Sequence, residues 1–268
     1  MVQRRLLHCR QSSSPFIHLT LGRHNPLFVS ISRNLTTTLS RGVSSIETKA
    51  MPVIKIEAVT DLLCPWCYVG KRNLDRAISQ YRAVDPSTEF EVVWKPFYLS
   101  PALKSTGYDK REMYTTRFSL AGDLPTAIAR VTSVCSAAGI NLNVTGRTGN
   151  SRQSHKLLRL ALVSKGPLAQ DRLLEALFRG HFELGADISD RNYLIKTAAA
   201  AAGLDEADVE AALDSDRAGE VVDEEVVGAR KAGVTGVPTF TVQGRWRVGG
   251  NQEPDVFLRV FERVTEGH

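Results

Sequence analysis

The sequence predicts an α/β fold that is interrupted by an all-helical insertion. A strand, a helix and a second strand are indicated over residues 53–97, and the strand signal returns only at Val234. Between about 107 and 233 the chain is rich in Ala and Leu and carries no strand-like run. Strands at both ends of a chain, with helices between them, favour one α/β domain assembled from two separate segments.

The first segment has a strand–helix–strand pattern. Residues 53–59 (VIKIEAV) are β-branched and apolar with partial alternation, which predicts a strand. Apolar residues then recur at helical spacing over about 65–81, and the turn sequence DPS at 85–87 precedes a second strand at 90–97 (FEVVWKPF). Because the connections are short, we expect the two strands to be parallel, with a right-handed crossover.

Helix boundaries are visible in the middle of the chain. Residues 154–167 (SHKLLRLALVSKGP) predict a helix that ends at a Gly-Pro stop. Asp190 is expected to cap a helix that runs to Gly203, and Asp205 to begin the next one. The region is predicted to hold four to six helices.

The last segment returns to strands. Residues 234–242 (VTGVPTFTV) are followed by a Gln-Gly turn and by a second strand over 245–249, and Pro254 suits the first position of a final helix. The predicted boundaries are 52–103 and 228–268 for the α/β domain and 104–227 for the helical insertion.

The positive charge of the chain is concentrated at one end. The chain of 268 residues has a net charge of +5. Residues 1–50 hold seven basic residues against the single acid Glu47, giving +6, and the remainder holds 27 basic and 28 acidic residues, giving −1. The rest of the chain is nearly neutral, so it lacks the excess positive charge that nucleic-acid binding requires. The sequence contains no run of about 18 apolar residues, so it predicts no membrane-spanning helix. We therefore expect no nucleic-acid partner and no membrane span. The sequence does not determine the oligomeric state.

The first fifty residues have the composition of a targeting sequence. From Met1 to Ile46 there is no Asp or Glu, while Arg, Ser, Thr and Leu recur. This pattern is typical of an organelle transit peptide. We therefore expect a mitochondrial protein with a mature N-terminus between about Arg33 and Met51. A disordered tail without an address is one alternative, and translation from Met51 would give a cytosolic form.

A pair of cysteines marks the candidate site. Cys64 and Cys67 form the sequence C-P-W-C directly after a predicted strand and at the start of a helix, whereas Cys9 lies in the predicted transit peptide. The unpaired amides and the dipole of a helix N-terminus stabilise a thiolate, so Cys64 is expected to be the nucleophile. Cys67 would lie one helical turn further on the same face and close the disulfide.

Three neighbours of the pair are expected to support it. Pro65 suits the first turn of a helix, and Trp66 would offer the substrate an apolar surface beside the sulfur. Asp61 could order the turn before the helix or accept the proton of Cys67, and the turn role is favoured.

A metal site and a structural disulfide are both less favoured for these cysteines. A zinc site usually needs four ligands, and Cys135, His155 and His181 do not have ligand spacing, so we expect no metal. A structural disulfide would close too short a loop to stabilise the fold appreciably. Cys135 is predicted to be a buried, inert thiol, and His155 a surface or interface residue.

A proline far along the chain is predicted to complete the site. In the sequence GVPTF, Pro238 is expected to begin a strand. Because proline has no backbone N–H, it cannot donate a hydrogen bond to a neighbouring strand. A cis Val237-Pro238 bond would leave the backbone of Val237 free to pair with an extended substrate. We therefore predict that Val237 and Pro238 bind substrate.

Four motifs together carry a family resemblance. The sequence CPWCYVG at 64–70, preceded by Asp61, occurs with WKPF at 94–97, NSRQSHKLL at 150–158 and GVTGVPTF at 233–240. In this combination the chain resembles the DsbA-like thioredoxin family, and within it the FrnE-type branch, over essentially all of residues 53 to 265. The resemblance implies a thioredoxin fold interrupted by an all-helical insertion domain, with Pro238 as a cis-proline facing Cys64 and Cys67. DsbA itself has His where Trp66 stands here, so strong oxidant character is not carried over.

The resemblance implies a protein disulfide oxidoreductase, acting on a protein or glutathione as its thiol or disulfide substrate. Glutathione is the candidate redox partner, and no other cofactor is expected. The alternative is a glutathione-dependent transferase or isomerase of the kappa type, acting on small molecules. Such enzymes resemble this chain in architecture but usually carry Ser in place of the first cysteine, so the pair Cys64 and Cys67 favours dithiol chemistry. The direction of the redox reaction stays open.

Overall fold

The computed structural model describes residues 53–105, 107–118 and 124–267. The predicted transit peptide, Cys9 and the alternative start at Met51 lie outside these residues. None of the helices in the described ranges is long and apolar enough to cross a membrane.

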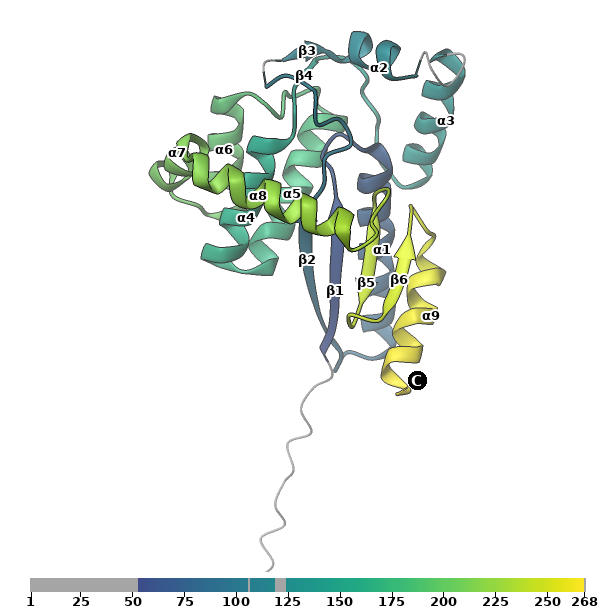
Figure 1. The fold of residues 1–268 in the computed structure, drawn as a ribbon. Coiled ribbons are helices and arrows are strands. Elements are labelled where there is room, and N and C mark those ends of the chain that lie inside the picture. Colours follow the sequence, from purple (N-terminus) through teal and green to yellow (C-terminus); the bar gives the residue numbers. More distant parts are fainter. Residues whose placement is uncertain (1–52, 106, 119–123, 268) are drawn as a thin grey trace, which may run out of the picture. The chain divides into compact units, whose positions relative to one another are not determined.

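Four strands form the central sheet, in the order β2-β1-β5-β6 (Figure 1). β1 and β2 pair in parallel, whereas β5 pairs antiparallel with both β1 and β6. Ala58 in β1 lies opposite Trp94 in β2 on one side and opposite Phe240 in β5 on the other. The last two strands of the chain therefore lie beside the first two, and the α/β domain is built from both ends as predicted. The strands are β1 (Val53–Thr60), β2 (Glu89–Pro96), β5 (Thr239–Val242) and β6 (Trp246–Gly249).

Two helices pack on the sheet through aromatic side chains. The ring of Phe240 lies 5.0 Å from that of Phe257, and the ring of Phe90 lies 4.9 Å from that of Phe261, measured between centroids. Phe240, Phe257 and Phe261 are buried in the main hydrophobic core, and Phe90 is partly buried and packs against it. The two helices are α1 (Pro65–Val84), which connects β1 to β2, and α9 (Pro254–Thr265), which ends the described chain.

The inserted region between β2 and β5 is mostly helical, and its predicted caps are confirmed. The Asp190 carboxylate accepts a hydrogen bond from the Tyr193 amide at 2.7 Å, and the Asp205 carboxylate accepts one from the Ala207 amide at 2.9 Å. The described elements are α2 (Lys110–Phe118), α3 (Leu124–Ala137), α4 (Arg152–Lys165), α5 (Pro167–Phe182), α6 (Arg191–Ala202), α7 (Glu206–Asp214) and α8 (Asp216–Lys231), with the short strands β3 (Tyr108–Asp109) and β4 (Arg147–Thr148).

This region differs from the prediction in two details. The series α2 to α8 exceeds the four to six helices expected, because Gly166 and Ser215 each end one helix and cap the next, so that no loop separates the helices. The antiparallel pair β3 and β4 was not predicted, because two residues are too few to show a strand period.

The insertion is attached to the free edge of β2. The side-chain amide of Gln170 in α5 accepts a hydrogen bond from the Trp94 backbone amide at 2.9 Å and donates one to the Trp94 carbonyl at 2.8 Å. Asp171 accepts from the Trp94 indole, also at 2.9 Å. These bonds continue the sheet into the insertion and fix α5, together with α4 packed against it, beside the start of α1.

Candidate active site

Cys64 lies at the N-terminus of α1 with its side chain turned toward the last strand pair. It is the N-cap residue, and its carbonyl accepts a hydrogen bond from the Cys67 amide at 3.0 Å. Its thiol donates to the Val237 carbonyl, with Sγ and O 3.7 Å apart, although the two residues are 173 positions apart in sequence. The Val237-Pro238 peptide bond is cis, as expected. The fold thus brings the two predicted halves of the site together.

The second cysteine is the more enclosed of the pair. Cys67 is fully buried in the core. Burial raises the pKa of its thiol well above the ordinary value, and the neighbouring Cys64 raises it further. The hydroxyl of Thr60 and the backbone N–H of Asp61 act in the opposite direction and lower the pKa of the same thiol. Cys67 therefore needs a proton acceptor before it can attack a sulfur atom.

Asp61 connects three parts of the chain through its buried carboxylate. Its Oδ1 accepts hydrogen bonds from the Leu63 amide at 3.2 Å and from the Ser151 hydroxyl at 2.7 Å, and its Oδ2 accepts from the Leu99 amide at 2.7 Å. These partners belong to the turn before α1, the segment after β2 and the N-terminus of α4. The contacts support the turn role considered for Asp61 and leave little capacity to accept a proton from Cys67.

His155 is buried beside this carboxylate and is not a surface residue. Its Nε2 lies 3.8 Å from Oδ1 of Asp61, and its side chain is 2% exposed. His155 follows Ser151 by one helical turn, which places both on the face of α4 that meets Asp61. From the sequence, His155 could point from the insertion toward the groove, and a surface or interface position was favoured. The surface position is wrong, because the side chain is buried where α4 meets Asp61.

Two residues of this neighbourhood were missed by sequence reasoning. Thr60 is the last residue of β1, and Ser151 is the N-cap of α4, although its side chain makes no hydrogen bond to that helix. A signal existed for Ser151, because its four-residue spacing from His155 at a helix start puts two polar side chains on one face. Nothing in the sequence distinguishes Thr60 from an ordinary strand residue.

The remaining predicted residues have less specific surroundings. Pro65 and Trp66 form the first turn of α1, where both are partly buried. Cys135 in α3 is buried, as expected, and this burial, with a smaller effect from Cys64, raises the pKa of its thiol to about 11. Among the described residues, no group of His, Cys, Asp and Glu side chains is arranged to hold a metal ion.

Gly70 allows α1 to lie directly against the cis-proline. A methyl group added at Gly70 would stand 2.9 Å from Cγ of Pro238 and 3.2 Å from the ring of Phe240. We expect Gly70→Ala to destabilise the protein by about 1–3 kcal/mol, because a close-packed core cannot absorb the methyl without strain. Urea denaturation measures the effect. Gly228→Ala in α8 is the matched control: its methyl would meet no atom within 4 Å, so it should leave stability unchanged or increase it by up to ~1 kcal/mol.

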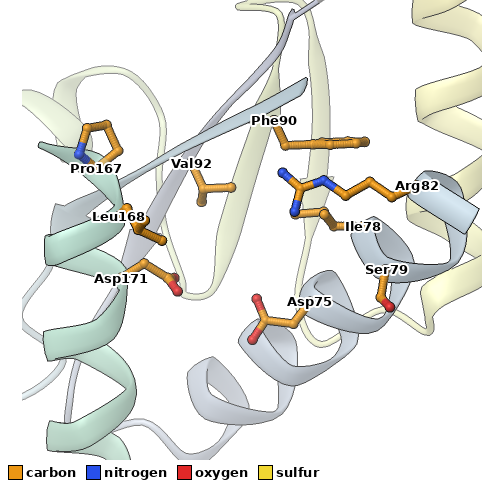
Figure 2. A pocket seen from close by; sticks show the side chains of 9 residues that line it. All are labelled: Asp75, Ile78, Ser79, Arg82, Phe90, Val92, Pro167, Leu168 and Asp171. Carbon is orange, nitrogen blue, oxygen red and sulfur yellow. The ribbon is translucent and has the colours of Figure 1, made fainter. Parts of the chain in front are cut away.

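Two of the cavities show where ligands could be accommodated. One of about 370 Å³ lies between α1, β2 and α5 and is lined by charged and apolar side chains, including Asp75, Arg82 and Asp171 (Figure 2). Neither cysteine of the pair lines it. Another, of about 480 Å³, is lined by Leu103, Met113 and other residues of the segments after β2. Leu99 belongs to the segment after β2, and its amide donates a hydrogen bond to the Asp61 carboxylate.

Comparison with solved structures supports the same fold. One similar protein is a probable DsbA oxidoreductase from Streptomyces coelicolor, with 28% identity over 80% of this chain and 91% of that chain, and a TM-score of 0.67. A 2-hydroxychromene-2-carboxylate isomerase is 17% identical over 79% of this chain and 96% of its own, with a TM-score of 0.57. The cytosolic disulfide reductase DsbM from Pseudomonas aeruginosa, in a structure with GSH, is 15% identical over 79% of this chain and 99% of its own, with a TM-score of 0.54. At these identities the last two similarities establish the fold alone.

The sequence itself matches a family over most of its length. Residues 55–262 match the DSBA-like thioredoxin domain. No curated protein matches the chain significantly. The matched range begins within β1 and ends within α9, so it spans the sheet, the inserted helices and both halves of the candidate site. This chain, with its thioredoxin-like α/β fold and the helices α4 to α8 inserted between the sheet strands, therefore belongs to the DSBA-like thioredoxin domain family.

Proposed function

We propose that this protein is a thiol–disulfide oxidoreductase in which Cys64 attacks the substrate and Cys67 closes the disulfide. One observation carries the proposal: the pair lies at the N-terminus of α1, and the Cys64 sulfur faces the carbonyl that precedes the cis-proline at 3.7 Å. Amides and the dipole at a helix N-terminus stabilise the attacking thiolate. The similarity to the oxidoreductase from Streptomyces coelicolor supports this chemistry.

The proposed cycle has two exchange steps. The Cys64 thiolate attacks one sulfur of a substrate disulfide, forming a mixed disulfide and releasing the first substrate thiolate. Cys67 then loses its proton and attacks Sγ of Cys64, which forms the Cys64–Cys67 disulfide and releases the second substrate thiolate. The substrate is reduced and the protein oxidised. In the reverse direction, the oxidised protein donates its disulfide to a dithiol.

The surroundings of the pair suit an extended thiol substrate. The backbone of Val237 offers polar groups beside Cys64, and Trp66 contributes an apolar surface at the start of α1. Glutathione and cysteine-containing peptides share the chemistry that such a site would recognise. Membership of the FrnE-type branch and import into mitochondria stay predictions from the sequence.

The central test is equilibration of the protein in glutathione redox buffers, followed by alkylation of free thiols. We expect the thiols of Cys64 and Cys67 to disappear together in a reversible two-electron transition, because they form one disulfide. The midpoint gives the redox direction, since about 30 mV corresponds to 1.4 kcal/mol for such a couple. Cys135→Ala should show the same transition, because Cys135 belongs to α3 and is not one of the two thiols that form the disulfide. If Cys64 and Cys67 both stay free in the most oxidising buffer, the proposed function is wrong.

A glutathione-dependent transferase or isomerase is the second candidate. The fold shared with the 2-hydroxychromene-2-carboxylate isomerase favours it. A reaction of that kind needs no resolving thiol, so turnover of a small substrate with glutathione would persist in Cys67→Ser. Disulfide exchange has the stronger support, because the fold places both thiols on one helix turn.

A further inference from the structure

The buried thiol of Cys67 raises the question of where its proton goes. The proposed function, on which this inference rests, requires the thiol to become a thiolate before it attacks Cys64. Yet Cys67 is fully buried, and burial disfavours the charged form. Two buried polar atoms, one on Thr60 beside Cys67 and one on His155, have no oxygen or nitrogen partner among the described residues.

The first of these atoms is the hydroxyl oxygen of Thr60. Thr60 is fully buried at the end of β1, and its Oγ1 has no oxygen or nitrogen partner within the described chain. Its neighbour is the Cys67 thiol, and a hydrogen bond from this hydroxyl lowers the pKa of that thiol. Because sulfur is a weak hydrogen-bond partner, part of the cost of burying the hydroxyl, about 1–3 kcal/mol, stays uncompensated.

The second atom is Nε2 of His155. This nitrogen is buried and has no hydrogen-bond partner among the described residues, although Asp61 lies 3.8 Å away. Thr60 and His155 line the same small cavity, of about 10 Å³. A cavity of roughly this size holds a single water molecule when polar partners surround it. One water there would satisfy the hydroxyl and the imidazole together.

One wall of the cavity carries partly exposed side chains. Arg159 in α4 and Glu225 in α8 form an ion pair of 3.0 Å in its wall, and their side chains are partly exposed. The charged and titratable groups that face the His155 ring or the cavity are Asp61, Lys95, Tyr98, Arg159 and Glu225.

We propose that His155 accepts the proton of Cys67 through the Thr60 hydroxyl and one water molecule in this cavity. The Cys67 thiol gives its proton to Oγ1 of Thr60, the hydroxyl gives its own proton to the water, and the water gives one to Nε2 of His155. The electron pair left on Cys67 forms the bond to Sγ of Cys64. The bond between Cys64 and the substrate sulfur breaks, and the substrate leaves as a thiolate. The carboxylate of Asp61 stabilises the imidazolium.

Asp61 is the competing acceptor, and its contacts argue against it. Its carboxylate oxygens already accept three hydrogen bonds, from Leu63, Leu99 and Ser151. The group of Asp61 that lowers the pKa of the Cys67 thiol is its backbone N–H. Asp61 therefore orients and stabilises His155 in this scheme and does not take the proton.

The test separates the two exchange steps by rapid mixing of the reduced protein with oxidised glutathione. In His155→Gln we expect closure of the Cys64–Cys67 disulfide to slow by about 100-fold, in line with the roughly 10²–10⁴-fold contribution of a positioned base. The attack of Cys64 should change by no more than about twofold, because His155 takes no part in that step. Closure in the variant should also become proportional to hydroxide concentration, whereas closure in the wild-type protein should depend less steeply on pH.

A pair of variants at Thr60 provides the matched control. Thr60→Val replaces the hydroxyl by a methyl group of similar size, and we expect the same slow closure as in His155→Gln. Thr60→Ser keeps a hydroxyl and should close at a rate close to that of the wild-type protein. If Thr60 had only a structural role, Thr60→Val would keep the wild-type rate and would be equally or more stable, since removing a buried hydroxyl without an oxygen or nitrogen partner is favourable.

The outcomes distinguish the relay from the proposed function. Wild-type closure in both His155→Gln and Thr60→Val would overturn the relay and leave the disulfide chemistry intact. If His155→Gln loses its circular dichroism signal, the comparison of Thr60→Val with Thr60→Ser decides the question alone. A wild-type protein that never forms a mixed disulfide at Cys64 would instead contradict the proposed function.

Discussion

Cys64→Ser should lower disulfide-reductase activity by a factor on the order of 10³ or more, because a serine hydroxyl is a weak nucleophile without an adjacent base. Both cysteines are buried in the core, but Cys64 is the one whose sulfur faces Val237, and it keeps a small exposed fraction of 3%, whereas Cys67 has none. No other described cysteine can replace it, since burial also raises the pKa of Cys135, to about 11. The measurement is the initial rate of reduction of a glutathionylated peptide, with glutathione as the reductant.

Cys67→Ser gives the complementary result and controls for misfolding. This variant keeps the attacking thiolate, so it should form a mixed disulfide with the peptide or with glutathione, detectable as an added mass on Cys64. It lacks the thiol that resolves that bond, and the adduct should accumulate. Cys64→Ser should form no adduct. An adduct on Cys67 in Cys64→Ser, or activity within about tenfold of the wild-type protein, would reverse the roles assigned here.

The sheet could be predicted from the sequence because its strands have strong local patterns. The first strand was expected at 53–59 and spans Val53–Thr60, and the second was expected at 90–97 and spans Glu89–Pro96. β-branched residues and turn sequences define such elements locally. The helix N-terminus at Cys64 follows from the same local logic, since Pro65 occupies its first turn.

The surroundings of the cysteines could not be predicted in the same way. Asp61 bonds Ser151 across 90 residues and Leu99 across 38, and no local pattern encodes which chain segments meet. That Val237 and Pro238 complete the site was expected from the sequence GVPTF together with the cysteine pair, and the family resemblance added that Pro238 faces Cys64 and Cys67. The cavity shared by Thr60 and His155 depends on how α4 packs against β1 and β2, which is a property of the tertiary structure alone.

Asp61→Ala is expected to destabilise the protein by about 3–9 kcal/mol, because it leaves two buried donors and one partly buried donor without their acceptor and each costs about 1–3 kcal/mol. The donors are the Leu63 amide, the Leu99 amide and the Ser151 hydroxyl. The carboxylate is fully buried, so water can replace it only if the structure opens. Denaturation in guanidinium chloride measures the decrease in the free energy of unfolding. The dependence of that free energy on denaturant concentration should be compared between the variants.

Ser151→Ala separates the hydrogen bonds of Asp61 from the effect of a cavity. It removes one donor and leaves the carboxylate with its two amide partners, so we expect a cost of only about 1 kcal/mol. A large loss in Asp61→Ala with a small one in Ser151→Ala would show that the carboxylate is the group that holds the turn before α1 to the segment after β2. If Asp61→Ala kept the wild-type midpoint, water would be satisfying all three donors. The turn that presents Cys64 would then be held by its own backbone and by the packing of α1 against Pro238.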